Sequence, residues 1–253
     1  FTIGGFAQDV DAADAETVID ALADTHLFTQ GDDIRVPPLN QIMAVWAGLA
    51  SGGTSLVRLA SPSLRDISRL VVGPLNGLAD ADVEPNDPPA VMDMSRHPRI
   101  LDIDEILQCT IRSNTSAAAF QWCFVVFGDG PPTVPSGEIF TVRSTGTTTV
   151  TARAWSTVSV TFADTLPTGR YQVVGLRAQG ATMIAARFVF KPGTWRPGAI
   201  ASDSEASNDF PIFRNGGMGI WGEFQQVTPP DMEVVCDAGD SAQTFDWDLI
   251  KVA

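Results

Sequence analysis

Hydrophobic and polar residues alternate along much of this chain, with the two-residue period of half-buried β-strands. The clearest case near the middle has Phe120, Trp122, Phe124 and Val126 on one face, with Gln121 and Cys123 on the other. Near the end, Phe245, Trp247 and Leu249 take the apolar face, while Asp246 and Asp248 take a face open to water. Both runs predict strands whose aromatic side chains are buried.

A helical pattern occurs once, in residues 9–25, where Val10, Ala13, Val18, Ala21 and Leu22 recur at roughly helical spacing. It predicts a short N-terminal helix. After Gly31, turn residues separate short apolar runs, which predict strands. In the second half these are 138–143, 147–154, 157–162, 170–178, 185–190, 218–224, 232–236 and 245–252. The polar stretch 194–217 and its counterpart 76–98 are predicted to be exposed loops.

The two halves of the sequence resemble each other, which indicates an internal repeat. Ser116 to Trp122 is matched by Ser241 to Trp247, and a cysteine precedes each motif, Cys109 and Cys236. Further matches in the same order are Gly48-Leu49 with Gly175-Leu176, and Arg58-Leu59 with Arg187-Phe188. A duplicated domain explains why separate matches keep their order.

Each repeat has the size and the number of predicted strands of a two-sheet sandwich. We therefore predict an all-β fold of two tandem antiparallel β-sandwiches, a double jelly roll, preceded by the short helix. The densest cluster of Gly and Pro, residues 128–137, marks the domain boundary. The predicted domains are 1–30, an N-terminal arm and helix; 31–130, the first jelly roll; 131–137, a linker; and 138–253, the second jelly roll.

Composition and charge narrow the function. The 253 residues are 44% hydrophobic, and 30 acidic side chains outnumber 16 basic ones, for a formal net charge of −14. A field of this sign repels phosphate backbones, so we expect no direct nucleic-acid binding. No apolar run reaches the roughly 18–20 residues that span a bilayer, and the start lacks the pattern of a signal peptide. We expect a soluble protein that is intracellular when made.

Residues that could carry chemistry are few. The three cysteines lack the close spacing of a zinc or redox motif, and the alternation does not favour a disulfide between Cys109 and Cys123. His26 and His97 are the only histidines, too few for a double cupin, and no Gly-x-Ser-x-Gly elbow accompanies them. The acids at Asp9, Asp11, Asp14 and Glu16 lack the glycine and the terminal glutamate of a calcium loop.

Two glycan-related hypotheses stay open. A glycosidase needs two carboxylates, and Asp102, Asp104 and Glu105, or Glu223 and Asp231, supply pairs that are equally well explained as loop or edge charges. The six tryptophans, at 46, 122, 155, 195, 221 and 247, provide aromatic surface for a sugar-binding sandwich, although two follow the buried pattern. Gly216 to Gly219 lacks the lysine of a phosphate loop. We predict no catalytic, cofactor-binding or metal-binding residue.

One stretch has a family resemblance. Leu166-Pro-Thr-Gly-Arg-Tyr-Gln-Val-Val-Gly-Leu176, with Ile184-Ala-Ala-Arg-Phe188 and Trp195-Arg-Pro197, resembles the second jelly roll of the major capsid proteins of tailless icosahedral, lipid-containing bacterial viruses. The resemblance covers the second half best, reaches the first half only through the repeat, and includes no motif as specific as a phosphate-binding loop.

The resemblance implies a structural protein and not an enzyme, located in the virion and made in the host cytoplasm. It implies a pseudo-hexameric homotrimer that tiles an icosahedral shell beside other virion proteins and above an internal lipid membrane. It implies no cofactor. The alternatives are a carbohydrate-binding or adhesive double sandwich and a two-domain glycan-active enzyme.

Overall fold

The computed structural model describes residues 1–10, 15–49, 54–67, 70–72, 91–113, 119–202 and 210–252. The chain divides into two compact units: Thr2–Gly130, and Pro131–Ala253 together with Phe1. The division falls within the Gly/Pro-rich run 128–137. Both units are built of β-strands, which confirms the predicted all-β class with two sandwiches.

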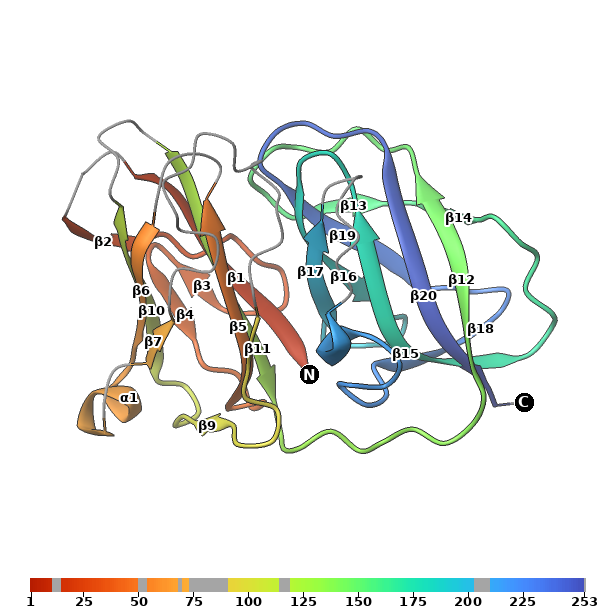
Figure 1. Ribbon diagram of the computed structural model, residues 1–253, viewed down its shortest axis with the longest axis horizontal. Helices are drawn as coiled ribbons and strands as arrows, with labels where there is room; N and C mark the ends of the chain where they lie inside the picture. The colour runs from red at the N-terminus through yellow and green to blue at the C-terminus, as the bar shows by residue number, and fades with distance from the viewer. Residues whose placement is uncertain are drawn as a thin grey trace. The chain divides into compact units, whose positions relative to one another are not determined.

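The first unit contains two sheets (Figure 1). One has the order β1-β11-β5-β8, with β9 also on β5, and the other has the order β3-β4-β10-β6-β7, with β2 also on β10. Its elements are β1 (Thr2–Val10), β2 (Glu16–Ile19), β3 (Thr29–Gln30), β4 (Asp33–Arg35), β5 (Gln41–Leu49), β6 (Thr54–Ala60), the helix α1 (Pro62–Ile67), β7 (Leu70–Val72), β8 (Met92–Asp93), β9 (Arg99–Ile100), β10 (Ile106–Ser113) and β11 (Ala119–Gly128).

The second unit has the continuous order β13-β19-β16-β17-β15-β20-β12-β14, with β18 also on β15. The two halves of this order meet at β17, which pairs antiparallel with β16 and, over two residues, parallel with β15. Its elements are β12 (Ile139–Gly146), β13 (Ser156–Val158), β14 (Val160–Phe162), β15 (Arg170–Gln179), β16 (Met183–Val189), β17 (Gly198–Ser202), the 3₁₀ turn η1 (Pro211–Phe213), β18 (Gly222–Gln225), β19 (Asp231–Cys236) and β20 (Gln243–Lys251).

The two units share one strand order. If the short additions β3, β4, β9 and β14 are set aside, each unit has eight strands, and its first, eighth, third and sixth strands are neighbours in one sheet. The second, seventh, fourth and fifth strands are neighbours in the other. This is the double Greek-key connection of a jelly roll. We call Thr2–Gly130 the first jelly roll and Pro131–Ala253 the second.

A β-bulge also recurs at the same place in both jelly rolls. Against β11, strand β5 carries one extra residue, Met43, opposite the step from Val126 to Phe127. Against β20, strand β15 carries one extra residue, Val174, opposite the step from Asp248 to Leu249. A bulge fixes the register and the local twist of a strand pair. Because the bulge recurs, the two final strands, β11 and β20, can be aligned with each other without comparing their side chains.

This alignment shows that the predicted match of Trp122 with Trp247 is wrong. With the bulges superposed, Trp247 corresponds to Val125. Trp247 lies between the two sheets, where its ring is 4.8 Å from that of Phe188 on β16. In the first jelly roll Cys123 takes this inward position: it lies close enough to Cys109, on β10 of the opposite sheet, to contribute to the raised pKa of that thiol. Trp122 therefore lies on the outer face of its sheet, although it is only 1% exposed.

The predicted N-terminal helix is also wrong. Residues 2–10 form β1, which pairs with β11 along its whole length, and residues 16–19 form β2, which pairs with β10. Gly4 and Gly5 permit this, because a Cβ at Gly5 would lie 2.6 Å from the Phe124 ring. Pairing with a long apolar strand outweighs the weak helical periodicity of residues 9–25. The segment expected to be an arm thus belongs to the sheets of the first jelly roll.

Two further differences concern loops. Residues 147–154, predicted as a strand, contain turns, because Val150 and Arg153 bond instead to the backbone carbonyls of Asp240 and Cys236. The stretch 194–217, predicted as a loop, contains β17 and η1. Its residues 203–209 lie outside the described part of the chain, as do residues 76–90 of the counterpart 76–98.

Candidate functional site

His26 lies in a hydrogen-bonded chain of the type found in hydrolases. Its Nδ1 donates to Asp24 Oδ1 at 2.5 Å, and its Nε2 is 2.6 Å from Thr2 Oγ1. The His26 and Asp24 side chains are 3% and 1% exposed, and Thr2 is fully buried. A buried hydroxyl is out of reach of a substrate carbonyl, so the chain attaches the loop before β3 to the start of β1. The sequence pointed to His26 but not to its partners Asp24 and Thr2.

The carboxylates considered for a glycosidase have structural partners. Glu105 Oε2 accepts hydrogen bonds from the Ser63 backbone N–H at 3.1 Å and from its hydroxyl at 2.9 Å, which holds the start of α1. Glu223 accepts a bond from Gln172 and lies 3.5 Å from Arg170, and Asp231 pairs with Lys191. Asp102 and Asp104 are exposed residues in the turn before β10.

The acids considered for a calcium loop are dispersed. Asp9 lies in β1, and Glu16 in β2 is paired with Arg58 at 2.8 and 3.0 Å. Asp11 and Asp14 lie outside the described residues. Across the described ranges, no three His, Cys, Asp or Glu side chains gather in a way that could hold a metal ion.

The outer face of the second jelly roll carries a buried ionic network. Asp248 is fully buried, and its carboxylate accepts bonds from Arg214 at 2.8 and 2.9 Å, from the Asn215 backbone N–H at 2.8 Å and from Thr141 Oγ1 at 2.7 Å. Burial raises the pKa of Asp248, but these hydrogen bonds outweigh it and hold the pKa below its usual value. Next to it, Asp246 pairs with Arg143 at 2.8 Å.

The prediction that water covers this face at Asp248 is therefore wrong. The segment around η1 folds over the sheet, and the backbone N–H groups of Gly216 and Trp221 bond to Val174 and Val173. Gly175 makes the close approach possible, because a Cβ there would collide with the Asp248 carboxylate and lie 3.0 Å from the backbone of Arg214. A glycine inside a predicted strand was the sequence signal for this covering segment.

A second buried ion pair lies on the opposite sheet. Arg187, 1% exposed, lies in β16 directly across from Glu233 in β19, and its guanidinium lies 2.7 Å from the Glu233 carboxylate. Trp155 covers the pair, with its ring centroid 3.7 Å from the Arg187 guanidinium carbon. Trp155 is thus engaged in a cation–π contact, and Trp46, Trp122 and Trp247 are each at most 1% exposed. Few of the tryptophans are free to form a sugar-stacking surface.

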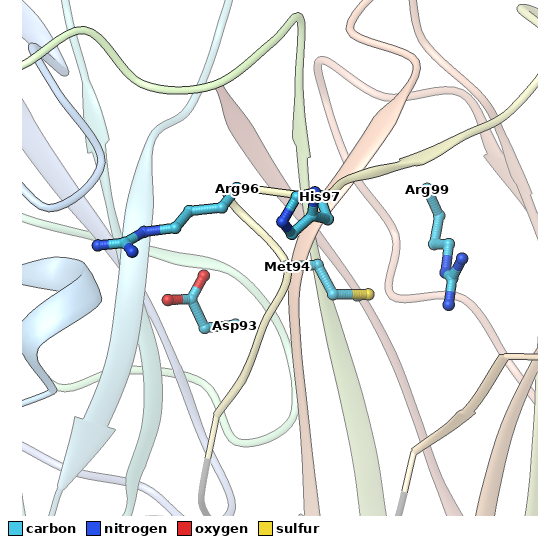
Figure 2. A pocket seen from close by; sticks show the side chains of 5 residues that line it. All are labelled: Asp93, Met94, Arg96, His97 and Arg99. Carbon is cyan, nitrogen blue, oxygen red and sulfur yellow. The ribbon is translucent and has the colours of Figure 1, made fainter.

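A surface pocket of about 330 Å³ lies between β8 and β9 in the first jelly roll. It is lined by Asp93, Met94, Arg96, His97 and Arg99, and Figure 2 shows Met94 and His97 between the two arginines. We call it the basic pocket. His97, the other histidine that the sequence singled out, is exposed here among cations, without a carboxylate arranged to orient it as a general base.

The strand order shared by the two units defines this molecule as a tandem jelly-roll protein. No family model matches its sequence, and no curated protein matches it. One solved structure, the STIV MCP, is similar over 98% of this chain and 97% of that chain, with 10% sequence identity and a TM-score of 0.26. That protein is a viral major capsid protein. Because the score is low, the fold assignment here rests on the strand order alone.

Within the described ranges, no helix has the length and apolar character needed to cross a bilayer.

Proposed function

We propose that this protein is a major capsid protein, three copies of which form a pseudo-hexameric trimer that tiles an icosahedral virion shell. The observation that carries the proposal is the repeated strand order, with its recurring bulge, in one chain. A trimer of such chains presents six similar sandwiches, so one building block meets its neighbours through nearly equivalent edges.

The roles of the ionisable side chains support a structural protein over an enzyme. Asp248, Glu233 and Glu105 each hold two segments together through two or more hydrogen bonds. Arginines, hydroxyls and backbone N–H groups donate to these carboxylates, and the bonds stabilise the folded chain.

The finer parts of the proposal rest on the resemblance of residues 166–197 to capsid proteins of lipid-containing bacterial viruses. They are an internal membrane under the shell, contacts with other virion proteins, synthesis in the host cytoplasm, and no direct contact with the genome. The net charge of −14 supports the last point, because it opposes binding to nucleic acid.

Sedimentation velocity and negative-stain microscopy of the purified chain test the proposal. We expect a species of three times the 26.9 kDa chain mass at micromolar concentration, and six-lobed particles that associate further into curved sheets or shells. A chain that stays monomeric and binds a glycan saturably would overturn the proposal in favour of a carbohydrate-binding sandwich. Hydrolysis of a glycan that is abolished by one Asp or Glu substitution would overturn it in favour of an enzyme.

A further inference from the structure

The basic pocket is a local exception in an acidic protein. The sequence has only 16 basic side chains against 30 acidic ones, yet two arginines and a histidine line this one pocket, with Asp93 as the one acid in its lining. Arg96 and Arg99 are exposed, and neither forms an ion pair with any residue in the described part of the chain. Guanidinium groups in this state bind carboxylates or phosphates well, since their forked donors match two oxygens.

Exposed isoleucines follow directly after the pocket. Ile100, Ile103 and Ile106 are 69%, 53% and 44% exposed, and they lie within the seven residues after Arg99. Isolated exposed apolar residues are ordinary, but several next to unpaired cations have the composition of a protein interface. The pocket and this segment lie on β8, β9 and the turn before β10, and β8 and β9 form one edge of the sheet β1-β11-β5-β8.

A complementary edge exists on the second jelly roll. Strand β12 pairs with β20 on one side, and on the other side β14 covers only Ser144 to Gly146. In the described part of the chain, Ile139 to Val142 therefore has an open edge, whereas the Arg143 carbonyl accepts a hydrogen bond from the Ala163 N–H. Two exposed acids flank it, Glu138 just before β12 and Asp164 just after β14, and neither forms an ion pair with a described residue.

These two edges are opposite edges of equivalent sheets, which decides what kind of contact they can form. Two copies of the basic pocket facing each other would oppose arginine with arginine, so a twofold contact through this surface is unfavourable. A contact between different surfaces, repeated from copy to copy, closes into a ring when the rotation allows it. A threefold ring is one such closure.

Building on the proposed function, we infer that the basic pocket of one copy binds the acidic β12 edge of the second jelly roll of a neighbouring copy. Arg96 and Arg99 receive the carboxylates of Glu138 and Asp164, and the exposed isoleucines pack beside them. The occupant of the pocket is thus a second copy of this chain.

A charge-swap series tests this contact. The variant R96E/R99E and the variant E138K/D164K each place like charges at the contact, so each is expected to weaken trimer formation at least about tenfold in sedimentation equilibrium. The combined variant R96E/R99E/E138K/D164K restores opposite charges and is expected to regain trimers. R153E/K191E is the matched control, because Arg153 and Lys191 are exposed, lie beside β19 in the other sheet of the second jelly roll, and change the net charge as much as R96E/R99E does.

The outcomes separate this inference from the proposed function. If the wild-type chain forms trimers and R96E/R99E forms them equally well, the contact is wrong and the capsid proposal stands. Weakening by both separate variants without recovery in the combined one also overturns the contact. If R96E/R99E assembles normally but loses calorimetric binding of a sulfated oligosaccharide, the pocket belongs to an anionic glycan. A wild-type chain that never associates overturns both proposals. Circular dichroism of each variant shows that it is folded.

Discussion

Asp248 illustrates what single residues do in this fold. Its carboxylate is fully buried on the outer face of β20, where Arg214, Thr141 and the Asn215 backbone satisfy it. Burial alone would favour the neutral acid, so the surrounding donors keep it charged. The same donors attach the η1 segment to the sheet. Through these bonds, the Asp248 side chain holds the η1 segment over a face of the sheet that would otherwise be exposed to water.

Replacing Asp248 by Asn is expected to lower the free energy of unfolding by about 3–5 kcal/mol, because the Arg214 guanidinium stays buried without a counter-charge. Urea denaturation followed by fluorescence measures the change. Glu223→Gln is the control: its ion pair with Arg170 is half exposed, so about 0–1 kcal/mol is expected. Equal losses for both variants would contradict the assigned role.

The pH dependence of the same variant has a definite sign. The folded-state pKa of Asp248 lies below its unfolded value, so its contribution is complete above the unfolded pKa of about 4 and is lost as the pH falls through the folded pKa. The difference in unfolding free energy between the wild type and Asp248→Asn is therefore expected to narrow as the pH falls from about 5 towards 2. Urea titrations across this range measure it, and a difference that widens in acid would contradict the depressed pKa.

The three cysteines are expected to be unreactive in the folded chain, because all three are buried and unpaired in disulfides. Burial raises the pKa of Cys236 to about 12, helped by Asp240 and Asp237 and opposed by a hydrogen bond from Thr182. Burial, followed by the contact with Cys123, raises the pKa of Cys109. At about pH 8 a chromogenic disulfide reagent should label none of them rapidly, and all three in guanidinium. A fast native reaction would show that one thiol is accessible.

At the scale of strands, the sequence predicts where a strand lies better than it predicts the register in which that strand pairs. Alternation located most strands of the second half because one of their faces is polar. It could not orient β11, where Cys123, Val125 and Phe127 are as apolar as Phe120, Trp122 and Phe124, and both sets are buried. The motif match shifted the alignment by an odd number of residues, which exchanges the two faces of a strand. Only the bulges at Met43 and Val174 show the true register.

The candidate sites were less predictable than the strands, because they depend on contacts between distant segments. The sequence singled out His26 and His97 for their side chains. The His26 chain includes Thr2, 24 residues away, and the pocket residues 93–99, although neighbours in sequence, are positioned by the pairing of β8 and β9 with β5. The helix expected in residues 9–25 failed for the same reason: Asp9 and Val10 pair with β11 and residues 16–19 pair with β10, both strands about a hundred residues away and invisible to local periodicity.

The corrected register predicts that two equivalent positions, one in β11 and one in β20, differ in whether they tolerate a charged side chain. Phe124 corresponds to Asp246, yet Phe124 is fully buried and stacked on Trp46 at 5.4 Å, whereas Asp246 has Arg143 as a partner. Phe124→Asp buries an unpaired carboxylate and is expected to cost more than about 4 kcal/mol, enough to unfold most of the chain. Phe124→Leu keeps an apolar side chain and should lose about 1–2 kcal/mol. Thermal melting distinguishes the two, and a folded Phe124→Asp variant would contradict the burial of this side chain.

At the scale of the whole molecule, the duplicated fold favours association of copies and the net negative charge opposes it. Two jelly rolls in one chain multiply the edges available for association, but a net charge of −14 makes every pair of copies repel. The repulsion between two copies of the chain extends over tens of ångströms. An ion pair such as the proposed one between Arg96 and Glu138 acts over only a few ångströms. Salt screens the long-range term first, since the Debye length falls from about 30 Å at 0.01 M to about 8 Å at 0.15 M ionic strength.

Association of the wild-type chain is therefore expected to strengthen as sodium chloride rises from about 0.01 to 0.15 M, and to weaken again only towards about 1 M, where the Debye length of about 3 Å also screens close ion pairs. Light scattering at fixed protein concentration measures both the rise and the later fall in association. A steady fall from the lowest salt onwards would show that local ion pairs, and not the net charge, control assembly.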